Sequence, residues 1–286
     1  MALVHSLWTK PMLKNSRGEN FKKQIETTVW CTASSVAYAK KNNEEIHLYA
    51  DGLGYDLLSF LPYDYFSRLS VPDYIPTEFW AAGKFYALLK MNLGDIHIDN
   101  DVFLKTPALI EEMKKGLSKN DLIIQSIEDS WQVLNSYYKL CRDVIKLNNI
   151  EFNHDLQADY SPAYNCGVVG INNKELKSIY LESYINNMCE IYSCPKAMDM
   201  IRNNENVCMD LLLEQQHLYN LVENNGYKTY NLLGSGNEVY EKAEAIGYQH
   251  LLGSEKWILL DKIKEQLKNL NPDIYKAVER KLKNYI

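Results

Sequence analysis

Two aspartates near residue 100 are the side chains of this chain best suited to hold a metal ion. A short apolar stretch at residues 96–98 leads into Asp99, and Asp101 follows with one residue between them. Alternate side chains of a strand share a face, so we expect both carboxylates to point the same way. Hard divalent cations such as Mg2+ and Mn2+ prefer oxygen ligands and can keep positions open for phosphate oxygens. The alternative for this pair is a solvated turn after a strand.

A second block whose residues suit metal and phosphate binding lies near the C-terminus, where His250, Gly253 and Lys256 are spaced as His-x-x-Gly-x-x-Lys. A neutral imidazole is a metal ligand, glycine lets the backbone approach a ligand closely, and lysine offers a compact positive charge to a phosphate group. The block would therefore complete a metal–diphosphate site that Asp99 and Asp101 begin. A surface turn with a partly buried histidine is the alternative for the block taken alone.

Three blocks, taken in this order, resemble a known group of enzymes. The pair Asp99–Asp101 closing a strand, the segment Asn165 to Val169 and the segment His250 to Trp257 are together similar to glycosyltransferases of the GT-A fold. The last block is most similar to the glycogenin-like family, glycosyltransferase family eight. That family has a proline between the lysine and the tryptophan, which this chain lacks, because Trp257 directly follows Lys256.

A further block, Trp80-x-x-Gly83-Lys84, precedes the two aspartates and is similar to one in uncharacterised bacterial glycosyltransferase-like proteins. In similar glycosyltransferases a basic residue at this position faces the sugar donor. The resemblance therefore assigns Lys84 to the donor site, and a solvated surface lysine is the alternative.

The resemblance implies an enzyme that moves a hexose from a nucleotide-diphosphate sugar, with UDP the favoured nucleotide, to a saccharide or another hydroxyl acceptor. It implies Asp99, Asp101 and His250 as the ligands of Mn2+ or Mg2+, and Lys256 as a contact of the diphosphate. A metal and cationic side chains stabilise the charge that grows on a leaving diphosphate. Retention of the anomeric configuration and a place in bacterial surface-polysaccharide synthesis are further expectations from the resemblance.

Four more residues are candidates for the sugar and the reaction centre. Asn165 offers donors and an acceptor to sugar hydroxyls, and Gly167 leaves space for the ring. Glu214 and Gln215, on a predicted helix, would stabilise positive charge at the anomeric carbon or act as a base. The alternatives are a β-bulge with a structural asparagine for the first pair and a solvated helix face for the second.

The elements that must position these residues begin with a βαβ unit. Apolar runs at residues 2–8 and 45–50 predict strands, and helical spacing of apolar residues predicts a helix over 21–41 between them. This order implies parallel pairing with a right-handed crossover. The other predicted elements are strands at 95–99, 121–127 and 164–171 and helices at 76–92, 130–147, 174–192, 207–222, 260–270 and 274–282.

These elements predict an α/β fold with a mixed, mostly parallel sheet flanked by helices, as in the GT-A fold that the motifs resemble. The sequence contains no repeat, low-complexity segment or long Pro/Gly linker. We therefore predict a single domain over residues 1–286, in which residues 259–286 form a C-terminal helical extension.

The predicted strand ends supply candidates for donor binding, because open sheets of this kind bind ligands at the carboxyl ends of their strands. Ser6 and Tyr49 lie at two such ends, and Asp51 could accept a hydrogen bond from the base or ribose, with a turn beside Gly52 as its alternative. His97 shares a strand face with Asp99 and is either its partner or a buried histidine. An acceptor-side role and a plain loop both stay open for His154, Asp155 and Asp159.

Composition limits the classes of partner. The formal net charge of −6 disfavours nucleic acid, whose phosphates attract basic surfaces. None of the six cysteines forms Cys-x-x-Cys, which indicates core thiols in a reducing compartment. The sequence shows neither a signal peptide nor an apolar run near the ~20 residues of a membrane span, so we expect a cytoplasmic protein. The basic helix at residues 276–283 is either a peripheral contact with an anionic membrane or a packing helix.

Two alternative functions stay open. A nucleotidyltransferase that acts on sugar phosphates also pairs an α/β sheet with acidic metal ligands, but it usually has a glycine-rich loop after the first strand, and here residues 9–20 contain one glycine. A protein that binds nucleotide sugars without turnover is the other alternative, which the missing proline before Trp257 favours.

Overall fold

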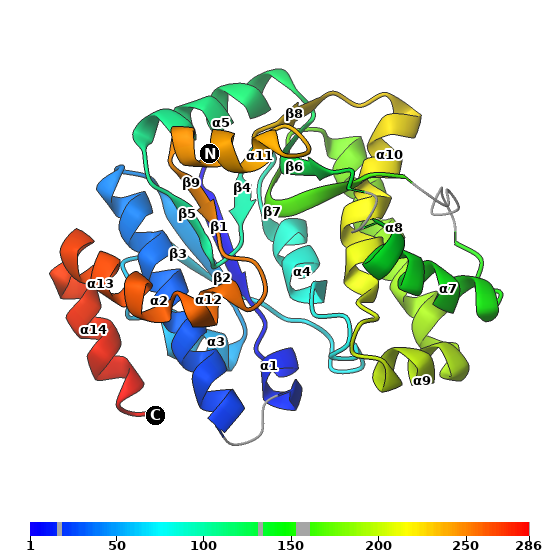
Figure 1. The fold of residues 1–286 in the computed structure, drawn as a ribbon, viewed down its shortest axis with the longest axis horizontal. Coiled ribbons are helices and arrows are strands. Elements are labelled where there is room, and N and C mark those ends of the chain that lie inside the picture. The colour runs from blue at the N-terminus through cyan, green and yellow to red at the C-terminus, as the bar shows by residue number, and fades with distance from the viewer. Residues whose placement is uncertain (16–18, 131–133, 153–160, 286) are drawn as a thin grey trace.

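The computed structural model describes residues 1–15, 19–130, 134–152 and 161–285, and its centre is a seven-stranded sheet (Figure 1). The strand order is β3-β2-β1-β4-β7-β6-β8. The strands of this sheet are β1 Leu3–Leu7, β2 Ile46–Ala50, β3 Tyr65–Arg68, β4 Ile96–Ile98, β6 Leu122–Glu128, β7 Ala163–Ile171 and β8 Thr229–Asn231.

The sheet is mixed and mostly parallel, as predicted. Strand β1 pairs in parallel with both β2 and β4, so the βαβ opening is confirmed. Strands β2 and β3, and likewise β6 and β8, are also parallel. Strand β7 pairs antiparallel with both of its neighbours, β4 and β6, and therefore runs against the direction of the other six. The carboxyl ends of β1 and β4 consequently meet at one edge of the sheet.

Helices cover both faces of this sheet. They are α1 Lys10–Asn15, α2 Glu19–Lys41, α3 Gly52–Leu58, α4 Ala82–Lys90, α5 Pro107–Lys119, α7 Lys139–Leu147, α8 Lys174–Tyr192, α9 Pro195–Asn203, α10 His217–Asn225, α11 Glu238–Ile246, α12 Glu255–Ile258, α13 Leu260–Leu270 and α14 Pro272–Leu282, with π-helical turns η1 Leu134–Tyr138 and η2 Leu211–Gln216. Helices α2, α13 and α14 lie on one side of the sheet and α4, α8 and α10 on the other (Figure 1).

Alternation along the strands produces this three-layer arrangement. In β1, Leu3 and Leu7 join the buried cluster on the α2 side, whereas Val4 and the following Trp8 join the cluster on the α4 side. Successive side chains of a strand point to opposite faces, so one apolar strand serves two cores. The sheet is therefore buried on both faces, and its strand ends are left to carry polar groups.

The C-terminal helices are part of the core on the α2 side. Leu267 and Val278 are fully buried there together with residues of α2. Asn271 caps α14, because its side chain accepts a hydrogen bond from the backbone N–H of Ile274 at 3.0 Å, and Pro272 occupies the first helical position. Helix α14 therefore starts two residues before the predicted position 274.

Two predicted helices have different bounds in the structure. The segment 76–92 is helical only from Ala82, because residues 76–81 form short turns whose buried Phe79 and Ala81 pack into the core. The segment 207–222 is helical from Met209, passes through the π-helical turn η2 and continues in α10 to Asn225. The polar stretch after β1 contains α1 and the beginning of α2 instead of one loop.

Two further properties bear on the sequence expectations. All six cysteines are free thiols, and Cys31, Cys141 and Cys166 are buried. Within the described parts of the chain, no helix has both the length and the apolar character that crossing a bilayer requires.

Candidate functional site

A cleft of about 830 Å³ opens at the edge of the sheet where β1 and β4 end. Its walls come from the end of β1, from α2, α4, β7 and η2, and from the segment that joins β9 to α12. The predicted site residues that line the cleft are Ser6, Lys84, Asp99, Asp101, Asn165, Gly167, Glu214, Gln215, His250, Gly253 and Lys256. Segments more than 200 residues apart in sequence thus contribute to one surface.

The two aspartates meet through a turn and not through a strand face, so the predicted reason for their proximity was wrong. Strand β4 ends before Asp99, and the backbone N–H of Val102 donates to the carbonyl of Asp99 at 3.0 Å. The N–H of Asp99 donates to the carbonyl of Gly167 at 2.9 Å, which ties the turn to β7. The turn directs both carboxylates into the cleft.

His250 reaches the aspartates because a short strand from the end of the chain pairs beside them. Strands β5 (Val102–Leu104) and β9 (Tyr248–His250) are antiparallel, with Val102 opposite His250. The N–H of Leu251 also donates to the carbonyl of Asp101 at 3.2 Å. Backbone pairing therefore fixes the imidazole next to the acidic turn.

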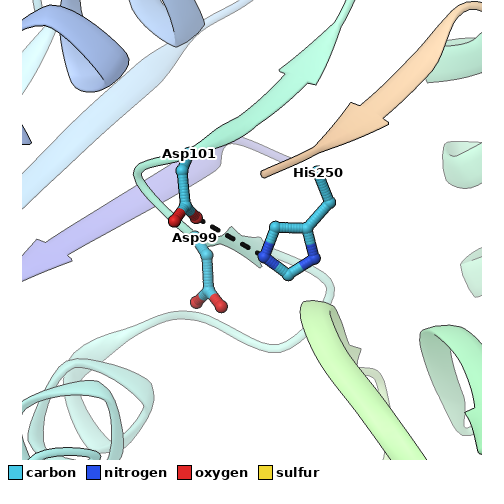
Figure 2. A group of neighbouring side chains, drawn as sticks. All are labelled: Asp99, Asp101 and His250. Carbon is cyan, nitrogen blue, oxygen red and sulfur yellow. Dashed lines mark ion pairs between the residues drawn. The ribbon is translucent and has the colours of Figure 1, made fainter. Parts of the chain in front are cut away.

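Asp99, Asp101 and His250 form a group that could hold a divalent cation. One ligand atom from each lies within 4.8 Å of the others, and Nε2 of His250 is 3.5 Å from Oδ1 of Asp101. Figure 2 shows this nitrogen of the ring turned toward the Asp101 carboxylate, with Asp99 beside it. Two carboxylates and one imidazole suit Mn2+ or Mg2+ and leave positions for further oxygen ligands.

Gln125 orients the imidazole of His250. Its side-chain oxygen accepts from Nδ1 of His250 at 2.8 Å and from the hydroxyl of Tyr248 at 2.6 Å. Burial raises the pKa of Tyr248 well above its usual range, so this hydroxyl keeps its proton and donates it. A carbonyl oxygen only accepts, so Nδ1 of His250 donates to Gln125, and Nε2 is the nitrogen that faces the aspartates. Such a partner orients the ring as a metal ligand requires.

Gly167 provides the room for this ring. A Cβ atom at this position would lie 2.6 Å from two atoms of the His250 imidazole and 2.3 Å from Oε1 of Gln125. We expected this glycine to leave space for a sugar ring, and the structure shows that the space is filled by the histidine. Gly253, which follows His250 along the cleft, has a φ of +52° and open space around its Cα.

Lys84 is buried beneath the cleft and contacts two carboxylates. Its Nζ lies 2.8 Å from Asp99 and 2.7 Å from Glu214, and it donates to the carbonyl of Cys166 at 3.0 Å. Burial acts to lower the pKa of Lys84, but the carboxylates of Asp99 and Glu214 outweigh it and raise the pKa above its usual range. The surface-lysine alternative for Lys84 and the solvated-face alternative for Glu214 are therefore wrong, since only 7% and 1% of these side chains are exposed.

Lys256 pairs with the other aspartate. Its Nζ is 2.5 Å from Oδ2 of Asp101, and about a third of the lysine side chain is exposed. Burial alone would raise the pKa of Asp101, yet the hydrogen bond from His250 and the charge of Lys256 hold it well below its usual range. Asp101 is therefore a carboxylate at neutral pH, ready to act as a ligand.

Another part of the cleft wall is a polar network. Asn165 donates to Oε1 of Glu128 at 2.9 Å, and its own oxygen accepts from the N–H of Gly167 at 3.1 Å. The hydroxyl of Tyr138 lies 2.7 Å from Oε1 of Gln215 and 3.1 Å from Oε2 of Glu128. The pairing of β6 with β7 shifts register beside this network, so the predicted structural role of the asparagine at a bulge is present as well.

Some residues of the cleft were not expected from the sequence. Glu128 and Tyr138 line the cleft and belong to no motif. Gln125 lies behind His250 and also belongs to no motif, although a glutamine inside an apolar strand was a usable signal. Asn100, between the two aspartates, donates to the carbonyl of Ser6 at 2.9 Å, and its buried oxygen has no hydrogen-bond partner among the described residues. This orphan acceptor points to a polar ligand at the acidic turn.

Other predicted residues have structural roles. The hydroxyl of Ser6, which lines the cleft, lies 2.8 Å from Nε2 of His97. His97 is buried, and burial followed by the charge of Lys84 lowers its pKa well below the usual range. Its Nδ1 also lies 3.8 Å from Oδ1 of Asp99, so this histidine is both buried and a neighbour of the aspartate.

Two predicted donor contacts, Tyr49 and Asp51, do not line the cleft. Tyr49 is buried in the core on the α4 side. Asp51 caps α3, accepting from Gly54 N–H at 2.8 Å and from the N–H and hydroxyl of Thr9 at 2.7 and 2.8 Å. The alternative for Asp51, a turn residue beside Gly52, is therefore correct. His154, Asp155 and Asp159 lie outside the described residues.

Comparison with known proteins places the chain in a family without assigning it an activity. No curated protein matches it. Residues 1–281 match the profile described as "Family of unknown function (DUF6734)", which covers nearly the whole chain, and the protein belongs to this family.

Proposed function

We propose that this protein is a metal-dependent glycosyltransferase of the GT-A type, which transfers a hexose from a nucleotide-diphosphate sugar to a saccharide or another hydroxyl acceptor. The observation that carries the proposal is the convergence of Asp99, Asp101 and His250 at one point of a cleft that also holds Lys84 and Lys256. The position of the cleft agrees with this function, because open α/β sheets bind ligands beyond the carboxyl ends of their strands.

The acidic turn and His250 would hold Mn2+ or Mg2+, and the ion when bound would supply positive charge that neutralises the diphosphate. The residues fit such an ion, since Gln125 holds Nδ1 of His250 and leaves Nε2 facing the two aspartates. Lys84 and Lys256 add two cations next to the acidic turn. Gly253, without a side chain at the cleft wall, allows close approach of a phosphate to the backbone.

The polar network of the cleft and the neighbouring Glu214 would bind the sugar and place the acceptor. Glu214, Gln215 and Asn165 present carboxylate and amide oxygens there, and hydroxyl groups of a sugar pair well with such groups. Glu214 is held by Lys84 and is positioned to stabilise positive charge at the anomeric carbon. The side chains of Trp80 and Tyr137 also line the cleft and offer flat apolar faces to a pyranose.

The test is hydrolysis of UDP-hexoses in the presence of Mn2+. The Asp101→Ala and His250→Ala variants should lose about a hundredfold or more of the wild-type rate, because each removes a ligand of the charge-stabilising ion. His47→Ala is a matched control, since His47 lies on β2, pairs with Glu45 and is outside the cleft. Wild-type turnover in both cleft variants would refute the site.

Two other outcomes would replace the proposal. Release of pyrophosphate from a nucleoside triphosphate and a sugar phosphate would identify a nucleotidyltransferase instead. Binding of nucleotide sugars without hydrolysis or transfer, and with no dependence on divalent metal, would identify a non-catalytic binding protein.

A further inference from the structure

Each aspartate of the candidate metal site is already neutralised by a lysine. Lys84 contacts Asp99 at 2.8 Å, and Lys256 contacts Asp101 at 2.5 Å. An ammonium group at hydrogen-bonding distance attracts the same oxygen atoms that a cation would use, and a divalent cation placed beside these groups would be repelled by both. The acidic turn is thus a poor site for a metal ion on its own.

The lysines would also hinder a diphosphate that arrives alone, because they are engaged with carboxylates that repel it. When metal and diphosphate arrive together, these conflicts are resolved at once. The carboxylates take the metal as their partner, Lys256 takes phosphate oxygens, and Lys84 keeps Glu214. Every charge then keeps an opposite charge as its neighbour.

We propose that Lys84 and Lys256 act as internal counter-ions of the metal site, so that the divalent cation and the diphosphate bind as a mutually dependent pair. The proposal rests on the proposed function for the identity of the anion, a nucleoside diphosphate. It adds a coupling between the two ligands of the site. The cation alone and the anion alone bind weakly, and each raises the affinity for the other by the same factor.

The two lysines have different parts in this exchange. Lys84 keeps Glu214 and the carbonyl of Cys166 as partners when it leaves Asp99, so it stays in place. Lys256 is half-buried, lies on the four-residue helix α12 and follows the exposed Gly253, which has a left-handed backbone. Lys256 is therefore the group that changes partner, from Asp101 to the anion.

The experiment is a titration of the full-length protein with Mn2+, with free Mn2+ read by electron paramagnetic resonance, in the absence and presence of saturating UDP. We expect UDP to lower the Kd of Mn2+ by about tenfold or more, and saturating Mn2+ to lower the Kd of UDP by the same factor. These are binding measurements and require no turnover.

A substitution at Lys256 separates this proposal from simple loss of a contact. Lys256→Met should bind Mn2+ alone several-fold more tightly than wild type, because the competing ammonium is gone, and should bind UDP with Mn2+ more weakly. Lys114→Met is the matched control and should change neither value, since Lys114 pairs with Glu44 at 2.8 Å outside the cleft. A purely structural role of Lys256 would weaken both measurements together.

The possible failures are distinct. If UDP binds, but Mn2+ binds equally tightly in the presence and in the absence of UDP, the counter-ion proposal is overturned while the proposed function stands. If UDP never binds but inorganic pyrophosphate shows the coupling, the counter-ion proposal is supported and a nucleotide donor is refuted. If neither anion changes the Kd of Mn2+, and Lys256→Met leaves that Kd unchanged, both proposals are overturned.

Discussion

The two lysines of the cleft occupy very different surroundings, although each contacts one aspartate. We call Lys84, Asp99 and Glu214 the inner half of the site and Asp101, His250 and Lys256 the outer half. The inner half joins α4 and η2, which pack in the core on the α4 side, and its lysine is 7% exposed. The outer half depends on a three-residue strand and a four-residue helix, and its lysine is 32% exposed.

This difference separates charges that hold the fold from charges that can serve a ligand. A buried ion pair cannot lose one partner without leaving the other charge uncompensated, whereas an exposed pair can exchange its partner for water or a ligand. Stability measurements should therefore respond to the inner half, and ligand measurements should respond mainly to the outer half. The predictions below test that division, beginning with the largest effect.

Removing the inner cation should destabilise the protein strongly. Lys84→Met leaves the Glu214 carboxylate buried without its ion pair, and breaking a buried pair by removing one partner costs about 3–5 kcal/mol. Chemical denaturation followed by circular dichroism measures this change in the free energy of unfolding. The double variant Lys84→Met/Glu214→Gln is the control, and it should recover most of the loss because no buried charge is left. A single variant as stable as wild type would show that the inner half does not hold the fold.

Asp210, a buried carboxyl group close to the inner half, should make the stability of the protein depend on pH. Asp210 is fully buried and accepts hydrogen bonds from Ala81 N–H at 2.8 Å and from the Tyr184 hydroxyl at 2.8 Å. Burial raises its pKa from 3.8 to about 7, and the nearby Glu214 adds to the rise. The hydrogen bonds and the charge of Lys84 oppose the rise without cancelling it.

The direction of this pH dependence follows from proton binding in the folded and unfolded states. Between pH 4 and pH 7 the folded state holds a proton on Asp210 that the unfolded state has released, so stability falls as the pH rises through this range and levels off above it. The effect is on the order of a few kcal/mol. Asp210→Asn, which resembles the protonated acid, should flatten this part of the profile when denaturation is measured from pH 4 to pH 8. An unchanged slope in the variant would contradict the assignment.

The comparison of the inner and outer halves also shows how much of the fold and of the site the sequence can predict. The apolar run of β1, the helical spacing of α2 and the apolar run of β2 are local patterns with a clear period, and the structure confirms all three elements. The inner half was partly accessible, because Lys84 lies in a recognisable block, but its burial against Glu214 depends on tertiary packing of distant segments.

The outer half shows why residue types were predictable and their geometry was not. The chemistry of Asp101 and His250 could be inferred from their motifs, yet the strand that brings them together, β9, has three residues and no measurable periodicity. Its pairing with β5 is a long-range contact that propensity does not encode. Gln125 was missed for a similar reason, since only the fold places its amide behind the imidazole.

Substitution of Gln125 gives a further prediction, because this side chain orients His250 of the outer half. Gln125→Leu leaves the Nδ1–H of His250 and the hydroxyl of Tyr248 without an acceptor, which should cost about 1–3 kcal/mol of stability. It should also weaken Mn2+ binding in the presence of UDP about 10–100-fold, because the imidazole loses the partner that fixes its tautomer. Nitrogen NMR of His250 reports the tautomer directly. Gln125→Glu keeps an acceptor in place, so recovery of the wild-type tautomer in that variant separates orientation from simple packing damage.

The smallest stability effect should come from the outer lysine, and its size decides whether the division holds. Lys256→Met removes a partly exposed ion pair, and such pairs contribute at most about 1 kcal/mol. Asp101, left behind, is 13% exposed and still has His250 beside it, so its charge keeps a neighbour that can carry a positive charge. Denaturation under the conditions used for Lys84→Met provides the direct comparison. A loss as large as that of the inner variant would mean that both lysines hold the fold, and Lys256 could then not exchange its partner for an anion at little cost.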